Sequence, residues 1–176
     1  MARLTDRKYV ATLLPVDSFE ERDAVLSREA LDEAYQSLLC EQIDRVEQML
    51  ELVAVEARWH ASLFYRLVRT RDRDDPDESD FCYIGTRVVF KDGTLSIQWL
   101  RNRYVKQGEG KPSKVYSTYI KKGAGFSYSM SLFKREPLWV RELVEATEED
   151  YTVLRERAAS LTKLRTELRK MQRRIG

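Results

Sequence analysis

The chain has 176 residues, enough for one domain with appendages, and its 31 basic and 29 acidic residues give a formal net charge of +2. No run of about 18 apolar residues is present and the first ten residues do not read as a signal peptide, so we expect a cytoplasmic protein. Two cysteines and one histidine are too few for the usual zinc sites within one chain. We expect the cysteines to be buried free thiols.

The near-neutral total conceals a strong separation of charge. Residues 81–135 hold 11 basic and 2 acidic side chains, whereas residues 1–80 hold 11 and 19 and residues 136–176 hold 9 and 8. This excess favours binding of a polyanion such as nucleic acid, although a merely solvated sheet surface is the alternative. The basic residues of this stretch are our predicted nucleic-acid-binding set: Arg87, Lys91, Arg101, Arg103, Lys106, Lys111, Lys114, Lys121, Lys122, Lys134 and Arg135.

The first part of the chain is predicted to be an N-terminal arm at residues 1–26 and an acidic helix at residues 27–70. Within the helix, apolar residues recur at alternating spacings of four and three, the pattern of a coiled-coil seam. The seam residues are Leu39, Ile43, Val46, Leu50, Val53 and Ala57. Residues 59–70 also fit a strand, but we favour helix to about Val68. The acidic outer face indicates either a docking surface or simple solvation.

An acidic loop is predicted at residues 71–80, followed by a basic antiparallel sheet at residues 81–135. Asp92-Gly93 lies between two alternating runs and is the strongest short-range signal for a hairpin. The returning run directs Leu95, Ile97 and Trp99 to one face, which we expect to be core. Two further runs, 114–122 and 126–132, complete a meander of four strands.

The remaining residues, 136–176, are predicted to be one long C-terminal helix that is basic in its second half. Thr147, Tyr151, Leu154, Ala158 and Leu161 hold the spacing of four and three. Leu164, Leu168, Met171 and Ile175 resume it after a shorter step, which predicts a stammer. The basic half suits either pairing with the acidic helix or a second contact with phosphates.

The expected fold class is therefore α+β. A small antiparallel four-stranded meander sheet is flanked by two long helices that pair as a coiled-coil-like hairpin or dimer.

Nothing in the sequence indicates catalysis. The glycines fit neither the P-loop nor the dinucleotide-binding spacing, and no Ser-His-Asp set or apolar pair of carboxylates can be named. We therefore expect a protein that is not an enzyme and that holds no cofactor or metal. Tyrosines interleave with the basic residues of the sheet, where they either stack on bases or belong to the core.

A family resemblance is carried by Ser96-Ile97-Gln98-Trp99, by Tyr119-Ile120-Lys121-Lys122-Gly123, and by Pro137-Leu138-Trp139 with the helix around Arg155. In this segment the chain resembles the MobI type of auxiliary mobilisation protein. Such proteins come from conjugative plasmids and integrative conjugative elements, and the resemblance covers about residues 80–170. It implies a factor that acts in the donor cell at the origin of transfer. There it would help the relaxase to recognise or process DNA without being the nuclease.

Two functions from different classes remain open. The first is an accessory factor that grips double-stranded DNA with the basic sheet, while its helices form a homodimer or dock a relaxase. The second is a coiled-coil adapter or antagonist with no nucleic-acid binding. A salt titration separates them, because binding to phosphates weakens steeply as salt rises.

Overall fold

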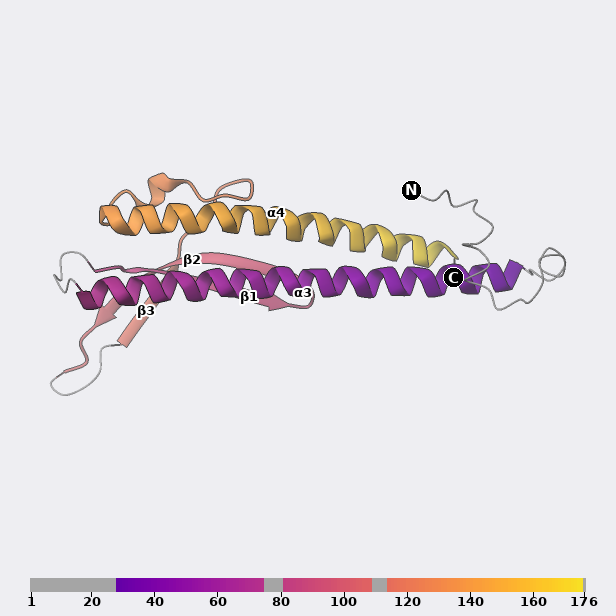
Figure 1. The fold of residues 1–176 in the computed structure, drawn as a ribbon, viewed down its shortest axis with the longest axis horizontal. Helices are drawn as coiled ribbons and strands as arrows, with labels where there is room; N and C mark the ends of the chain where they lie inside the picture. Colours follow the sequence, from indigo (N-terminus) through magenta and orange to yellow (C-terminus); the bar gives the residue numbers. More distant parts are fainter. Residues whose placement is uncertain (1–27, 75–80, 109–113, 176) are drawn as a thin grey trace. The chain divides into compact units, whose positions relative to one another are not determined.

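The computed structural model describes residues 28–74, 81–108 and 114–175, so the expected arm at residues 1–26 lies outside the described residues. The elements in chain order are helix α3 (Arg28–Asp74), strands β1 (Ile84–Lys91), β2 (Thr94–Val105) and β3 (Lys114–Tyr119), the 3-10 helix η2 (Met130–Phe133) and helix α4 (Leu138–Ile175) (Figure 1). They form two compact units, one of residues 48–162 and the other of residues 1–47 with 163–176. Neither described helix contains a stretch apolar enough to cross a membrane.

The three strands form one antiparallel sheet in the order β1-β2-β3. Lys91 pairs with Thr94, and the two residues between them, Asp92 and Gly93, have φ angles of 52° and 67°. A two-residue turn with positive φ at both positions matches the twist of the strands that it joins. The predicted Asp-Gly hairpin is confirmed.

One face of the sheet, the covered face, packs against the helices of the 48–162 unit. Trp99 is fully buried, and its ring centroid lies 5.2 Å from that of Phe64 in α3 and 5.6 Å from that of Tyr151 in α4. Ile84, Thr86 and Ile97 are buried with it. The predicted core position of Trp99 is confirmed.

We call the opposite face of the sheet the open face. The residues on it are assigned from the alternation of side chains along each strand and from the strand register. It carries Arg87, Lys91, Tyr104 and Tyr119, all of them exposed. Ser117 Oγ donates a hydrogen bond to Asn102 Oδ1 at 2.7 Å across this face.

The sheet has three strands, so the prediction of four was wrong. In the segment expected to be the fourth strand, the backbone N–H of Tyr128 donates to Glu148 Oε1 at 2.7 Å, and the carbonyl of Phe126 accepts from Arg155 Nη1 at 2.8 Å. The segment then enters η2, with Ser129 at its N-cap. Side chains of α4 thus satisfy backbone groups that a neighbouring strand would otherwise pair.

The helices are not shown to pair as a coiled coil, which corrects the second part of the predicted fold class. In the 48–162 unit they lie side by side and antiparallel, with Arg157 Nη1 2.8 Å from Glu56 Oε2. The seam residue Tyr151 packs on Trp99 of the sheet, however, and Thr86 Oγ1 donates to its hydroxyl at 3.1 Å. The apolar seam is therefore shared with the sheet, as in a layered α+β arrangement.

The expected stammer in α4 is also wrong. Leu164 is 46% exposed, whereas the next residue, Arg165, is only 8% exposed, and its Nη1 lies 3.8 Å from Glu47 Oε1. The buried positions thus continue at the regular spacing through an arginine. An apolar pattern alone could not place an arginine on that face.

The predictions for residues 59–70, for the acidic loop and for the cysteines can be compared with the structure. Helix α3 continues through residues 59–70 to Asp74, which confirms helix over strand and makes residues 71–74 of the expected acidic loop helical. The rest of that loop, residues 75–80, lies outside the described residues. Both cysteines are free, but only Cys82 is buried; Cys40 is exposed, contrary to expectation, and accepts a hydrogen bond from Gln172 Nε2 at 3.1 Å.

Tyr151 provides a test of the packing between α4 and the sheet. Burial raises its pKa from the ordinary 10.0 to about 12, so the unfolded chain releases this proton at lower pH than the folded protein does. Between those two values the free energy of unfolding should fall by about 1.4 kcal/mol per pH unit on account of this residue. We expect Tyr151→Phe to lose clearly less stability than wild type between pH 9 and about pH 11.5, as measured by urea unfolding.

The exposed Tyr116 offers a matched control, and Tyr116→Phe should keep the wild-type alkaline loss. An identical loss in wild type and Tyr151→Phe would show that the Tyr151 hydroxyl is not buried as described.

Candidate nucleic-acid interface

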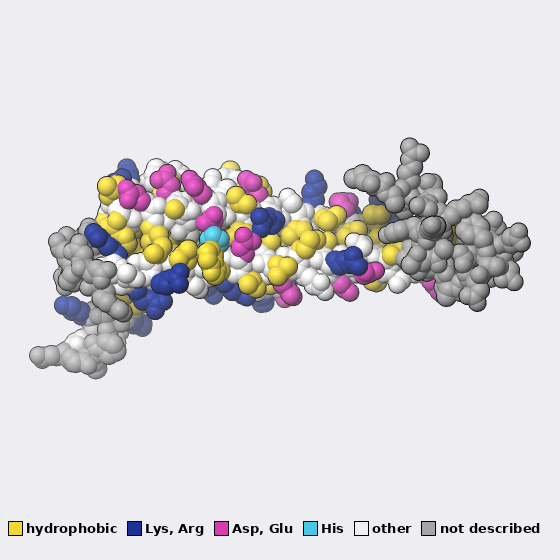
Figure 2. All heavy atoms as spheres, viewed as in Figure 1, with side chains coloured by type: hydrophobic (Ala, Val, Ile, Leu, Met, Phe, Trp, Pro, Cys, Tyr) yellow, Lys and Arg dark blue, Asp and Glu magenta, His cyan; other side chains and the backbone are white. Residues whose placement is uncertain are grey.

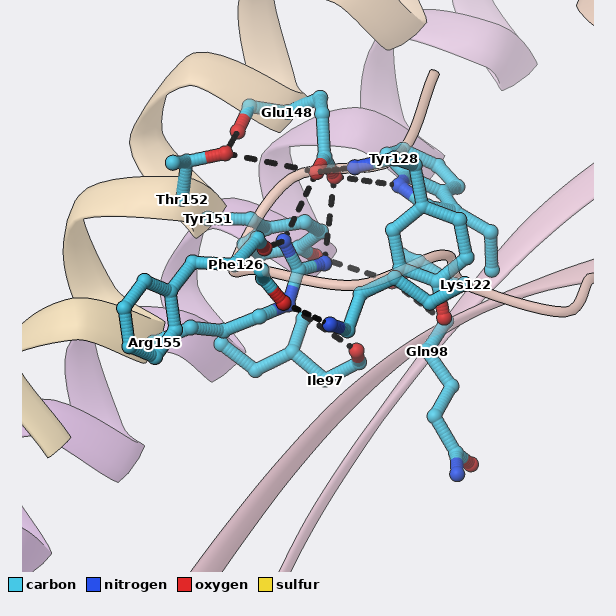
Figure 3. Close-up of polar contacts among 12 residues, drawn as sticks. Ile97, Gln98, Lys122, Phe126, Tyr128, Glu148, Tyr151, Thr152 and Arg155 are labelled. Carbon is cyan, nitrogen blue, oxygen red and sulfur yellow. Dashed lines mark hydrogen bonds and ion pairs between the residues drawn. The ribbon is translucent and has the colours of Figure 1, made fainter. Parts of the chain in front are cut away.

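A buried ion pair on α4 organises the loop that follows β3. Glu148 and Arg155 are 4% and 9% exposed, and they lie seven residues apart, two turns along one face of the helix. Arg155 Nη1 lies 2.8 Å from Glu148 Oε1, and Arg155 Nη2 lies 3.1 Å from Glu148 Oε2 (Figure 3). This two-pronged geometry is the strong form of an arginine–carboxylate contact.

The remaining hydrogen-bonding capacity of the pair goes to the sheet and the loop. Trp99 Nε1 donates to Glu148 Oε2 at 2.7 Å, and the Tyr128 N–H occupies Oε1. Arg155 Nε donates to the Ile97 carbonyl at 3.3 Å, and the guanidinium carbon lies 5.0 Å from the centre of the Tyr128 ring. The pair is therefore satisfied on both sides, as buried charges must be.

These contacts explain the path of the chain after β3. β3 ends at Tyr119, which pairs with Leu100, so β3 does not extend along the first half of β2. The Ile120 N–H still donates to the Trp99 carbonyl at 2.9 Å. Beyond it, Arg155 bonds both the Ile97 carbonyl of β2 and the Phe126 carbonyl of the loop. Residues 120–128 are thus anchored beside the edge of β2.

A cavity of about 420 Å³ lies at this edge. It is lined by Leu95, Ser96, Ile97, Gln98, Tyr119, Ile120, Lys121, Lys122, Tyr128 and Arg155. Among these lining residues there is no carboxylate, and the charge of Arg155 is matched by Glu148 behind it. The two lysines give the cavity a net positive charge, which suits an anionic oxygen such as that of a phosphate.

The two lysines are held differently. Lys121 is exposed, whereas Lys122 is half-buried and its Nζ donates to the carbonyl of Gly125 in the same loop. Lys122 therefore also helps to hold the loop, and Lys121 is the better placed of the two to meet a ligand.

The open face adds two further cations, and one of them contacts a residue of the cavity wall. Arg87 Nη1 donates to the hydroxyl of Tyr119 at 2.6 Å, and Tyr119 itself lines the cavity. Lys91 lies on the same face of β1 as Arg87. We refer to Arg87, Lys91, Lys121 and Lys122 as the basic edge.

The structure does not gather the other predicted residues at the basic edge. The alternation of side chains assigns Arg101, Arg103 and Lys114 to the side of the sheet opposite Arg87, and Arg101 Nη2 lies 3.0 Å from Glu136 Oε1. Lys106 follows β2, Lys134 and Arg135 follow η2, and Lys111 lies outside the described residues. Sequence reasoning also missed Glu148 and Arg155, whose spacing of seven on a helix was the available signal.

The ion pair can be tested through stability. Arg155→Met leaves the Glu148 carboxylate buried without its counter-charge, and we expect the free energy of unfolding to fall by about 3–5 kcal/mol in a denaturant titration. The double variant Glu148→Gln/Arg155→Met should lose clearly less than the sum of the two single variants, because it buries no lone charge.

Arg157→Met is the matched control, since Arg157 pairs with Glu56 on the exposed surface. It should lose no more than about 1 kcal/mol. Additive losses at Glu148 and Arg155 would show that the two side chains act independently.

Comparison with known proteins gives a match to a family model. The family model described as MobI protein matches residues 53–169, which include the whole sheet, the buried ion pair and the basic edge. No curated protein and no solved structure matches the chain. The match covers well over half of the sequence and confirms the resemblance drawn from residues 80–170. The chain therefore belongs to the MobI family, and this membership indicates a role in plasmid mobilisation.

Proposed function

We propose that the protein is a non-catalytic DNA-binding accessory factor that acts at the origin of transfer and assists the relaxase. The observation that carries this proposal is the cavity at the basic edge, where Lys121 and Lys122 have no carboxylate among the described lining residues. Arg87 extends the positive charge from the cavity onto the open face through Tyr119. Phosphate oxygens are the groups that such a surface attracts.

The distribution of charge in the 48–162 unit supports the same function. In Figure 2, acidic side chains gather over the first half of α4, and most basic ones lie on the opposite side of this unit, towards α3 and the strands. Glu148, which contacts the cavity residues Tyr128 and Arg155, is buried and neutralised by Arg155. A polyanion that approached the basic edge would therefore meet little repulsion there.

The only histidine has a structural place in the same unit. His60 Nδ1 lies 3.0 Å from Asp150 Oδ2, and its ring packs edge-on against Trp59 at a centroid distance of 4.8 Å. His60 therefore contributes to the contact between α3 and α4.

Salt dependence tests the proposed phosphate contacts. We expect wild type to bind a short duplex with an affinity that falls steeply with salt. Because Arg87→Gln/Lys121→Gln removes two phosphate contacts, it should reduce the slope of log K against log salt by about two units. Fluorescence anisotropy at several salt concentrations measures both slopes.

The charge-matched control is Arg103→Gln/Lys114→Gln, which removes two cations from the opposite side of the sheet. It should leave the slope close to that of wild type. A larger effect of this control than of the Arg87/Lys121 variant would place the DNA on the other face, and no salt-dependent binding by wild type would rule out the proposed function.

A second candidate function, docking of a protein partner, is favoured by one observation. Leu52, Val55 and Trp59 recur along α3 at spacings of three and four and are 67%, 57% and 59% exposed. Such a row of exposed apolar side chains is typical of a protein-interaction surface. The relaxase is the partner that we propose for it.

The two functions can be separated in cells and in vitro. If the row docks a partner, Leu52→Ser/Val55→Ser should weaken binding to that partner by about tenfold or more, which is a loss of about 1.4 kcal/mol. The frequency of plasmid mobilisation should fall as a result. DNA binding by the purified variant should remain at the wild-type level. Mobilisation at the wild-type frequency would show that this row docks no required partner.

A further inference from the structure

We infer that the open face of the sheet binds single-stranded DNA, whose unpaired bases stack on its tyrosines. This inference rests on the proposed function and names the form of DNA that the open face would take. It is carried by three exposed tyrosines of the open face: Tyr83, Tyr104 and Tyr119.

The three tyrosines lie on one face of the sheet and come from its three successive chain segments. Tyr83 directly precedes β1, and its carbonyl accepts a hydrogen bond from the Asn102 N–H at 2.7 Å, so it continues the β1-β2 ladder. Tyr104 is in β2, and its ring centroid is 6.1 Å from that of Tyr83. Tyr119 ends β3 opposite Leu100. Because side chains alternate along each strand, all three lie on the same face of the sheet as Arg87 and on the opposite face from Trp99.

Their exposure is unusual for side chains of this size and position. Tyr83, Tyr104 and Tyr119 are 39%, 53% and 51% exposed, whereas the aromatic residue at the centre of the covered face, Trp99, is fully buried. The sheet therefore presents a second set of aromatic rings that the described helices do not cover. Aromatic rings on an exposed sheet face are the means by which several nucleic-acid-binding folds stack bases.

Positive charge lies next to these rings in the arrangement that single-strand binding requires. Arg87 donates to the Tyr119 hydroxyl at 2.6 Å, which fixes a guanidinium beside that ring. Tyr119 also lines the cavity that contains Lys121. A strand whose base stacks on Tyr119 would therefore have cations close by to receive its phosphates.

The rings favour single strands over duplex. In a duplex each base is already stacked between its neighbours, so its flat surface cannot reach a tyrosine, whereas an unpaired base offers that surface freely. The alternative occupant of exposed tyrosines is a protein partner. A protein partner would leave nucleic-acid binding independent of the rings.

The test compares a labelled oligothymidylate with a duplex of the same length, bound to the full chain and measured by fluorescence anisotropy at one salt concentration. We expect wild type to bind the single strand more tightly than the duplex. Tyr83→Leu/Tyr104→Leu, which leaves Tyr119 and its contact with Arg87 in place, should weaken single-strand binding by about tenfold or more and leave duplex binding nearly unchanged. Tyr83→Phe/Tyr104→Phe keeps the rings and should retain most of the single-strand affinity.

Tyr116 provides the matched control. It is about as exposed as Tyr119 and lies on the same strand, but on the other face of the sheet. Tyr116→Leu should bind both DNA forms as wild type does, and circular dichroism checks that each variant is folded. Single-strand binding that survives the double leucine variant, or falls equally with duplex binding, overturns this inference while the proposed function stands. A wild-type protein that binds neither form overturns both.

Discussion

The structure depends on the buried ion pair between Glu148 and Arg155. Burying two charges carries a desolvation cost of several kcal/mol per ion, which the further hydrogen bonds of the pair help to offset. The partners in these bonds lie in three different places: Trp99 in the core of the sheet, the Ile97 carbonyl at the edge of β2, and the backbone of Tyr128 in the following loop. One helix thereby fixes both the sheet and the loop that carries Lys121.

This constraint also connects the fold to the proposed function. Because Glu148 is neutralised within the protein, it does not compete with phosphate for the lysines of the cavity. The two faces of the sheet have different roles. The covered face forms the core around Trp99, and the open face keeps Arg87 and Tyr119 exposed beside the cavity. Binding on the open face would therefore not disturb the packing that holds the sheet to the helices.

The local features of the fold could be predicted because they have local causes. Positive φ at Asp92 and Gly93 made the hairpin, and alternation placed Trp99 in the core. The failed fourth strand had no local signal, since aromatic residues alternating with serines around Tyr128 fit a strand as well as they fit a loop held by Glu148. The alternation of side chains along the strands already indicated that the basic residues lie on two different faces of the sheet. A count of charges along the chain does not distinguish the two faces.

The basic second half of α4 differs from the basic edge, because arginines in it are paired with a carboxylate of α3. Within the unit of residues 1–47 and 163–176, Arg169 Nη2 lies 2.7 Å from Glu47 Oε1, and Arg165 approaches the same carboxylate. These arginines face acidic partners in the chain itself, as the acidic character of α3 led us to expect in one of two alternatives. A phosphate would have to displace Glu47 to reach them, whereas Lys121 at the cavity has no such competitor among the described lining residues. The 48–162 unit, which nearly coincides with the matched region 53–169, is therefore where nucleic-acid binding should be sought.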